Sequence, residues 1–248
     1  MDSPSRYMRH ILLRPIGEQG QRAISGGTAV VLGLGGLGSA VANLLCRAGV
    51  GTLRMVDRDI VETHNLQRQT LYDEQDVARR RPKALAAAER LARVNAGVNL
   101  EPLVQEVNES TVRRMIEGAT VVVDGMDNFQ ARSVINRACV EMGIPWVHAA
   151  CVGTYGTVHT VLPGETACYE CLLPDAKNKN ASFTADTVGI LGPLANLIGC
   201  YEAVEAIKVL TGRREDVLTK VLWLDAWTNQ IMFYDAARNP SCPVCGEA

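Results

Sequence analysis

A glycine-rich segment is the first stretch of the chain whose residue types could do chemistry. Residues 30–38 read VVLGLGGLG, in which Gly33, Gly35 and Gly38 fit the pattern G-x-G-x-x-G and Gly36 lies between them. A strand-like run precedes the glycines, and the residues after them, SAVANLL, are typical of a helix. Backbone N–H groups and a helix N-terminus would then face an anion. The segment predicts a phosphate-binding turn and leaves both NAD and ATP open as the nucleotide.

Polar side chains gather after the next predicted strand. Asp57 comes 19 residues after the last glycine of the turn, about where dinucleotide-binding folds keep the acid that holds the ribose. Asp59, Asn65, Arg68 and Gln69 follow in a turn-rich segment. A guanidinium beside phosphates suits a triphosphate, whose charge must be neutralised during chemistry, better than a pyrophosphate that is merely held. The alternative is a solvated surface loop.

Lys83 directly follows Pro82, a residue that fits the first turn of a helix. Lys83 would then lie beside the positive end of the helix dipole, where a cation is unfavourable by about 0.3–1 kcal/mol unless an anion is nearby. The position of Lys83 therefore indicates that a phosphate binds beside it. The alternative is that residues 79–83 form a basic exposed corner.

The segment VVVDGMDN, residues 121–128, places further carboxylates at the end of a buried strand. Asp124 closes the strand, and Asp127 and Asn128 follow in a turn at the carboxyl end of the sheet, where open α/β sheets bind their ligands. A carboxylate there could hold Mg²⁺, which prefers oxygen ligands and substrate phosphates. Alternatively, Asn128 caps the helix that begins near Phe129, and the negative charge of Asp127 stabilises the N-terminus of the same helix.

Four of the eight cysteines form two C-x-x-C pairs, Cys168 with Cys171 and Cys242 with Cys245. Two such pairs can complete a tetrahedral Cys₄ zinc site that has no open position. The gap between the pairs is longer than in a compact zinc ribbon, but the Cys-Pro-x-Cys-Gly form of the second pair favours structural Zn²⁺ over redox dithiol chemistry. The other cysteines lie in or beside apolar segments and are predicted to be small buried side chains: Cys46, Cys139, Cys151 and Cys200.

These residues need a scaffold that brings distant turns together. Between residues 28 and 150, short β-branched runs alternate with longer helical segments, which is the order expected of a parallel sheet covered on both faces. Beyond residue 151 the strands follow more closely around one long helix, so we expect the sheet to continue with antiparallel strands. The predicted strands are 29–32, 53–56, 100–104, 120–124, 146–149, 156–162, 217–225 and 230–234, and the predicted helices are 37–48, 82–95, 109–117, 129–142 and 193–210.

The predicted fold class is therefore α/β, a Rossmann-like doubly wound mixed sheet whose parallel N-terminal half is extended by antiparallel C-terminal strands. We expect one domain over residues 1–248, with a helical arm at 1–27, a nucleotide-binding half at 28–150 and a zinc-binding half at 151–248. A polar stretch within residues 173–188 predicts a long mobile loop.

Composition excludes several classes of protein. Lys and Arg number 25 against 27 Asp and Glu, and a net charge of -2 argues against a general nucleic-acid or membrane binder. Charges interrupt the apolar residues at the start of the chain, so no secretory signal is expected. The most apolar later stretch, residues 188–204, is too short and too interrupted to span a bilayer. We therefore expect a cytoplasmic protein with reduced cysteines.

Together, these ordered motifs resemble the ThiF/MoeB/HesA family. Its members are adenylyltransferases that activate ubiquitin-like sulfur carriers in thiamine and molybdopterin biosynthesis. Within the family, the chain most resembles the molybdopterin-synthase type. The likeness runs nearly end to end. It covers RYMRH at residues 6–10, GLGGLG, DRD, NLQRQ, RPK, DGMDN, the two C-x-x-C pairs and GILGPLANLIGCYEAVEAIK.

The resemblance implies that ATP is the nucleotide and that the carboxylate of a carrier protein ending in Gly-Gly attacks its α-phosphorus, giving an acyl-adenylate and pyrophosphate. It assigns Asp57 to the ribose hydroxyls and Asn65, Arg68 and Lys83 to the phosphates. Asp127 would position Mg²⁺ and the reacting group. The nucleotide would lie against Gly33, Gly35, Gly36, Gly38, Asp57, Asp59, Asn65, Arg68, Gln69, Lys83, Asp127 and Asn128.

Arg9 matches the arginine that, in the family, reaches into the neighbouring subunit's site, so the resemblance also implies a homodimer. By this resemblance the catalytic residues would be Arg9, Arg68, Lys83 and Asp127.

One position departs from part of the family. Relatives that bind the carrier covalently keep a cysteine shortly before the G-x-L/V-G-P run, and that place falls on Ala185, with no cysteine between Cys171 and Cys200. We therefore expect an enzyme that stops at the adenylate and relies on a separate sulfur donor, since no rhodanese-like segment follows. Two alternatives remain: adenylation of a short peptide, and an NAD-binding oxidoreductase.

Overall fold

The computed structural model describes residues 6–175 and 184–246. Its strands are β1 (Thr28–Leu32), β2 (Thr52–Val56), β3 (Asn99–Leu103), β4 (Val121–Asp124), β5 (Trp146–Val152), β6 (Tyr155–Val161), β7 (Val221–Asp225) and β8 (Gln230–Tyr234). Its α-helices are α1 (Met8–Ile11), α2 (Gly17–Gly26), α3 (Gly36–Ala48), α4 (Glu74–Ala78), α5 (Lys83–Val94), α6 (Val112–Ile116), α7 (Phe129–Met142), α8 (Tyr169–Leu172), α9 (Ala185–Val188) and α10 (Gly192–Leu210).

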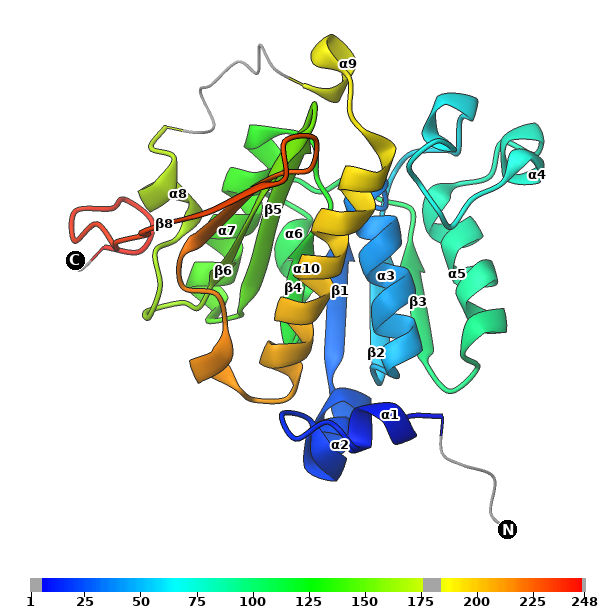
Figure 1. Cartoon of the computed structure of the whole chain (residues 1–248). Coiled ribbons are helices and arrows are strands. Elements are labelled where there is room, and N and C mark those ends of the chain that lie inside the picture. Colours follow the sequence, from blue (N-terminus) through cyan, green and yellow to red (C-terminus); the bar gives the residue numbers. More distant parts are fainter. Residues whose placement is uncertain (1–5, 176–183, 247–248) are drawn as a thin grey trace.

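Within these residues the strands form one eight-stranded mixed sheet in the order β3-β2-β1-β4-β5-β6-β7-β8 (Figure 1). The first five strands in this order run parallel, and β6, β7 and β8 each pair antiparallel with the preceding strand. The α/β fold class and the antiparallel extension predicted from the sequence are confirmed.

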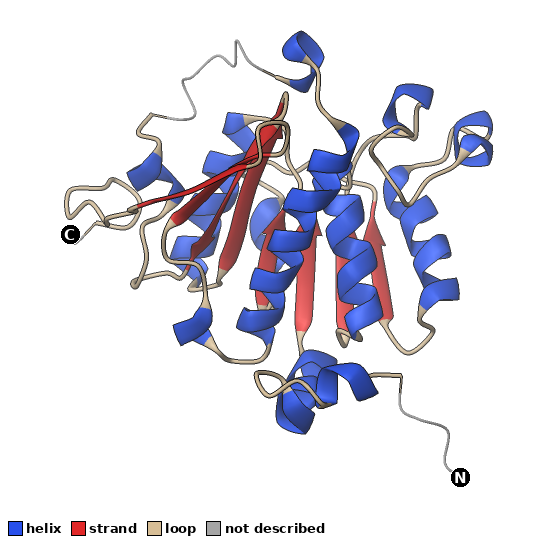
Figure 2. Cartoon of the chain, viewed as in Figure 1, coloured by secondary structure: helices blue, strands red, loops and turns tan. Residues whose placement is uncertain are grey.

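Helices cover both faces of the parallel half of the sheet (Figure 2). On β1, Val31 packs into a core with α3, α5 and α10, whereas Val30 and Leu32 point to the other face, into a core with α6 and α7. Strands buried on both faces read as continuous apolar runs, which is why TAVVL and VVVD carry no polar alternation. The long helix α10 packs closely on α3. A Cβ on Gly199 of α10 would lie only 3.0 Å from the Leu37 carbonyl oxygen of α3, so this close approach requires glycine.

Three predicted boundaries were wrong by three or more residues. Strand β5 continues to Val152 and does not end at residue 149, and the starts of β7 and α6 differ for local reasons. Strand β7 begins at Val221 and not at residue 217, since the Leu218 N–H donates to the Glu205 carboxylate at 2.7 Å instead of joining a strand ladder. Helix α6 begins at Val112 because hydrogen bonds between the Asn108 and Thr111 side chains and nearby backbone N–H groups hold the preceding residues in a turn. The predicted mobile loop lies partly outside the described residues, at 176–183; its later part forms α9.

No helix in the described part of the chain is both long enough and apolar enough to cross a membrane. The cytoplasmic location stays a prediction.

Helix α10 carries two buried glutamates with opposite surroundings. The Glu205 carboxylate accepts hydrogen bonds from the Thr160 hydroxyl at 2.9 Å and from the Leu218 N–H at 2.7 Å. Glu202 is fully buried, and neither carboxyl oxygen has a hydrogen-bond partner among the described residues. Burial, reinforced by the charge of Asp124, raises the pKa of Glu202 well above its ordinary value. Burial in the folded protein therefore favours the neutral form of Glu202.

We predict that Glu202→Gln raises thermal stability at high pH more than at low pH. The unfolded chain releases the Glu202 proton above a pH of about 4.3 while the folded chain keeps it, so the wild type loses stability as pH rises toward the raised pKa, and glutamine cannot ionise. The difference in Tm between variant and wild type should grow between pH 5 and pH 8, by about 2–4 °C for each kcal/mol of stability. Circular dichroism during heating measures it.

Glu205→Gln on the same helix is the control. Since the Glu205 carboxylate is hydrogen-bonded, its replacement should lower Tm at both pH values. An equal effect of Glu202→Gln at pH 5 and pH 8 would contradict the assignment of a neutral Glu202.

Candidate active site

A cavity of about 1080 Å³ lies at the carboxyl ends of β1, β2 and β4. Because parallel strands end at one edge of the sheet, turns that are far apart in sequence meet there. Its lining includes most of the residues singled out from the sequence: Gly33, Gly35, Gly36, Asp57, Asp59, Asn65, Arg68, Gln69, Lys83, Asp127 and Asn128. Gly38 and Arg9 do not line it.

The glycine turn brings the N-terminus of α3 to the cavity. Gly33 has a φ of +90°, and a Cβ there would lie 2.5 Å from the Gly125 carbonyl oxygen. A Cβ on Gly38 would come within 1.9 Å of the Gly33 carbonyl oxygen, so this glycine serves the packing of α3 on β1. No side chain caps α3. Its first N–H groups, which as in any helix have no intrahelical partner, therefore also lack a side-chain cap and are suited to an anion.

Asp57 follows β2 and is held from both sides. Its two carboxylate oxygens accept hydrogen bonds from the N–H groups of Leu34 and Asp59, each at 2.7 Å. Burial raises the pKa of Asp57, and the neighbouring charge of Lys83 opposes this rise. The carboxylate has a fixed orientation at the cavity wall, beside the glycine turn.

Lys83 lies in the first turn of α5, as predicted, although the helix begins at Lys83 itself and Pro82 is its N-cap and not its first residue. The Lys83 ammonium lies 3.1 Å from an Asp59 carboxylate oxygen. The side chain of Lys83 is 8% exposed and that of Asp59 is 56% exposed. The protein therefore supplies part of the negative charge that this position of Lys83 requires, and both residues line the cavity.

Arg68 lies against the glycine turn. A Cβ on Gly36 would contact the Arg68 side chain at 3.5 Å, and the Arg68 guanidinium donates to the His64 carbonyl at 3.0 Å. The adjacent Gln69 is buried, and its side-chain oxygen has no hydrogen-bond partner among the described residues. An unpartnered buried polar atom in a cavity wall favours a ligand that completes its hydrogen bonding.

The turn after β4 carries Asp127 and Asn128, which are both exposed. The Asn128 side chain caps α7 by accepting the Ala131 N–H at 2.8 Å, and it also donates to an Asp127 oxygen at 3.1 Å. The alternative role considered for Asn128, capping the helix that begins at Phe129, is therefore observed. Asp127 keeps its second oxygen for a cation, and an exposed carboxylate beside a cavity fits the oxygen donors that Mg²⁺ requires.

Arg132 and Cys151 are among the cavity-lining residues that sequence reasoning did not assign to the site. Arg132 lies in the first turns of α7, where a cation is unfavourable beside the helix dipole. The argument applied to Lys83 could have identified it. Cys151 is only half-buried and Cys200 is exposed, so the prediction of buried side chains was wrong for these two cysteines.

Arg9 is exposed on α1, below the opposite end of the sheet (Figure 1). The adjacent residues attach this arm to the C-terminal end of α5: the Asn95 side chain donates to the Tyr7 hydroxyl at 2.9 Å, and Arg6 donates to the Val94 carbonyl. Arg9 is therefore remote from the cavity of its own chain.

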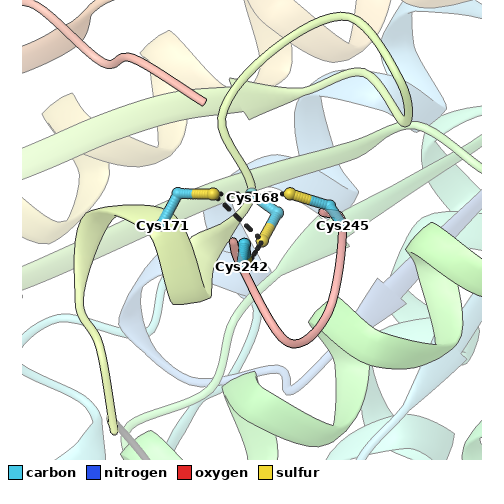
Figure 3. A group of neighbouring side chains, drawn as sticks. All are labelled: Cys168, Cys171, Cys242 and Cys245. Carbon is cyan, nitrogen blue, oxygen red and sulfur yellow. Dashed lines mark hydrogen bonds between the residues drawn. The ribbon is translucent and has the colours of Figure 1, made fainter. Parts of the chain in front are cut away.

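The two C-x-x-C pairs come together, as Figure 3 shows. The Sγ atoms of Cys168, Cys171, Cys242 and Cys245 all lie within 4.8 Å of one another. Individual separations are 3.8 Å for Cys168 and Cys171, 3.6 Å for Cys168 and Cys242, and 3.3 Å for Cys171 and Cys245. Tetrahedral Zn²⁺ with bonds of about 2.3 Å would place its sulfurs about 3.8 Å apart. The cluster fits a closed zinc site that attaches the C-terminal segment to α8.

Comparisons with known proteins agree with this geometry. The chain matches the ThiF family model over residues 7–244. It is 42% identical over 244 residues to the sulfur carrier protein ThiS adenylyltransferase of Bacillus subtilis, covering 97% of this chain and 71% of that protein. It is 36% identical to the molybdopterin-synthase adenylyltransferase of Escherichia coli, covering 98% and 96%. A crystal structure of E. coli MccB with AMPCPP and MccA aligns with a TM-score of 0.83 at 25% identity, covering 98% and 74%.

We predict that the purified protein holds about one zinc ion per chain. Cys245→Ser should lower both the zinc content and Tm, because loss of one thiolate opens a closed site. Elemental mass spectrometry measures the zinc content, and thermal unfolding measures Tm. Cys200→Ser, an exposed cysteine of α10, is the control and should change neither. Full zinc content in Cys245→Ser would contradict the assignment.

Proposed function

The chain belongs to the ThiF family and is an adenylyltransferase, and we propose that it adenylates the C-terminal carboxylate of a sulfur-carrier protein with ATP. The observation that carries this proposal is one cavity in which Arg68, Lys83 and Asp127 surround an uncapped helix N-terminus. The relatives named as sulfur-carrier adenylyltransferases support the choice of substrate.

Charge repulsion is the main obstacle to this reaction. A carboxylate and a phosphate charge 4 Å apart repel by about 1 kcal/mol in water and about 4 kcal/mol near a protein surface. Arg68, Lys83 and the N–H groups of α3 would offset this repulsion without reorganising, since the protein already orients them. A carboxylate oxygen could then attack the α-phosphorus, while the bond to pyrophosphate breaks and the pyrophosphate leaves.

The remaining polar groups would orient the nucleotide. The fixed carboxylate of Asp57 is suited to the ribose hydroxyls, and Gln69 offers its unpartnered oxygen nearby. Asp127 would hold Mg²⁺, which when bound neutralises phosphate charge. Asn128 keeps the Asp127 side chain directed by the hydrogen bond between them. In this proposal the protein contributes positioning and charge, and no covalent step.

The position of Arg9 favours a homodimer. Because α1 lies at the opposite end of the sheet from the cavity, Arg9 could act on the nucleotide only in a second copy of the chain (Figure 1). In a two-fold dimer the arm of each chain would complete the cavity of its partner.

No cysteine favours a covalent intermediate. The position before the glycine-proline run is Ala185, the first residue of α9. Cys151 lines the cavity, but burial raises the pKa of its thiol to about 12, so little nucleophilic thiolate is present at neutral pH. We propose that the reaction stops at the adenylate and that a separate protein delivers sulfur.

We predict that the protein with Mg²⁺ exchanges labelled pyrophosphate into ATP when a carrier ending in Gly-Gly is added. Thiamine-type and molybdopterin-type carriers should be compared, because both kinds of enzyme occur among the relatives. Asp127→Ala and Lys83→Ala should lower the rate about 100-fold, since each removes a group that stabilises the charged transition state. Cys200→Ala is the control and should keep the wild-type rate.

The outcomes separate the alternatives. ATP binding without exchange for any carrier would point to a short peptide substrate. Tight binding of NADH in place of ATP would contradict adenylation and favour the oxidoreductase.

Mixing two inactive variants tests the role of Arg9. Arg9→Ala and Asp127→Ala should each lose carrier-dependent exchange. Coexpressed with different tags, they should recover about a quarter of the wild-type rate, because half of the dimers are mixed and each of those keeps one intact site. A mixture no more active than its components would contradict a shared site.

A further inference from the structure

The first turns of helix α10, with the sequence GPLAN, lie against the cavity wall. Ala195 lines the cavity, and a Cβ on Gly36 would lie 2.9 Å from the Ala195 Cβ and 3.5 Å from the Arg68 side chain. Asn196 does not line the cavity and is half-buried. The start of α10 therefore meets the glycine turn and Arg68 at one place, beside the N-terminus of α3 (Figure 1).

The side chain of Asn196 connects α10 to the backbone of Arg68. Its Nδ2 donates to the Arg68 carbonyl at 3.2 Å and to the Gly192 carbonyl, one turn earlier in α10, at 3.3 Å. Asn196 and Arg68 are 128 residues apart in the chain. One amide group therefore holds two distant segments of the protein at a fixed separation.

Gly192 brings the same two segments into direct contact. A Cβ on Gly192 would lie 2.5 Å from the Gln67 carbonyl oxygen and 2.6 Å from the Gln67 side-chain oxygen. Any side chain at residue 192 would therefore push the backbone that precedes Arg68 away from α10. The lack of a Cβ at this position and the amide of Asn196 act on the same short segment.

The start of α10 is itself attached to the sheet. The Leu191 N–H donates to the Gly153 carbonyl at 2.8 Å, and the Gly153 N–H donates to the Gly189 carbonyl at 2.9 Å. Gly153 lies in the turn between β5 and β6. Asn196 therefore extends from a part of α10 whose position the sheet determines.

The contacts within the Arg68 segment are local. The segment follows a 3-10 helix (Thr63–Asn65), and the N–H groups of Arg68 and Gln69 both donate to the Asn65 carbonyl, at 3.1 and 3.0 Å. The Arg68 guanidinium donates to the His64 carbonyl of the same segment. Such contacts shape the turn but do not fix where it lies relative to the glycine turn. The contacts from α10 join separate segments and do fix it.

We propose that Asn196 is a positioning residue for Arg68. Together with Gly192, its amide holds the Arg68 backbone against α10, and this keeps the guanidinium beside the N-terminus of α3. The inference rests on the proposed role of Arg68 at the phosphates of ATP. The GPLAN segment then connects the turn between β5 and β6 to the nucleotide site.

Asn196→Leu tests the proposal, because leucine has about the size of asparagine and lacks the amide donor. Hydrogen–deuterium exchange should be about 5-fold faster for the amides at residues 65–69, since a hydrogen bond between two segments is lost. Isothermal titration calorimetry should give a Kd for ATP with Mg²⁺ about 5-fold higher. Asn43→Leu is the matched control: Asn43 is half-buried on α3 and accepts a hydrogen bond from Arg47 of the same helix, so its replacement should change neither quantity.

A double-mutant cycle separates positioning from a general effect on the fold. In an Arg68→Ala background, Asn196→Leu should not raise the Kd for ATP further, because its effect passes through the Arg68 side chain. Gly192→Ala should reproduce the faster amide exchange at residues 65–69 by a different route, since its Cβ would meet the Gln67 carbonyl.

The results distinguish the possible failures. Wild-type amide exchange and wild-type ATP affinity in Asn196→Leu would overturn the proposal. A rise in Kd that persists in full without the Arg68 side chain would also overturn it, because Asn196 would then act by another route. Should Asn196→Leu fail to fold, unchanged amide exchange at residues 65–69 in Gly192→Ala would overturn it. The expected coupling in a protein that adenylates no carrier would support the positioning role and refute the proposed function.

Discussion

The close contact between two glycine backbones at the ends of β1 and β4 is the constraint on which the site depends. A Cβ on Gly125 would lie 2.1 Å from the Gly33 carbonyl oxygen, and a Cβ on Gly38 would lie 1.9 Å from the same atom. Any side chain at these positions would separate the N-terminus of α3 from the turn that carries Asp127. The phosphate-binding turn and the candidate cation ligand share one cavity because Gly38 and Gly125 leave room for that carbonyl.

Around this contact, the charged groups of the cavity are oriented by the protein itself. Asp57 is held by two backbone N–H groups, Lys83 by the Asp59 carboxylate and Arg68 by the His64 carbonyl. Groups with fixed positions need little reorganisation when charge develops during a reaction, and this is how electrostatic stabilisation lowers a barrier. In the protein interior, Asp124 and Arg132 also orient each other, through a buried ion pair.

The periodicity of the sequence was sufficient for the larger elements of the fold. Strands such as β1 and helices such as α7 were predicted with boundaries within one residue, because their apolar runs are long and end at glycine, asparagine or proline signals. The short helices α4, α8 and α9 were not predicted, since four or five residues carry too little periodicity. The late start of β7 depends on a hydrogen bond to Glu205, which no local pattern contains.

The sequence by itself determined which polar residues follow which strands, and the rule that parallel strands end at one edge then brought Asp57, Arg68, Lys83 and Asp127 to one cavity. It also determined the four cysteines of the cluster, because paired spacing limits the possible ligands. Only the tertiary structure decided the partners of these groups, such as Asp59 for Lys83, and the buried ion pair of Asp124 and Arg132. Burial and pairing are set by segments distant in the chain, and no local pattern encodes those contacts.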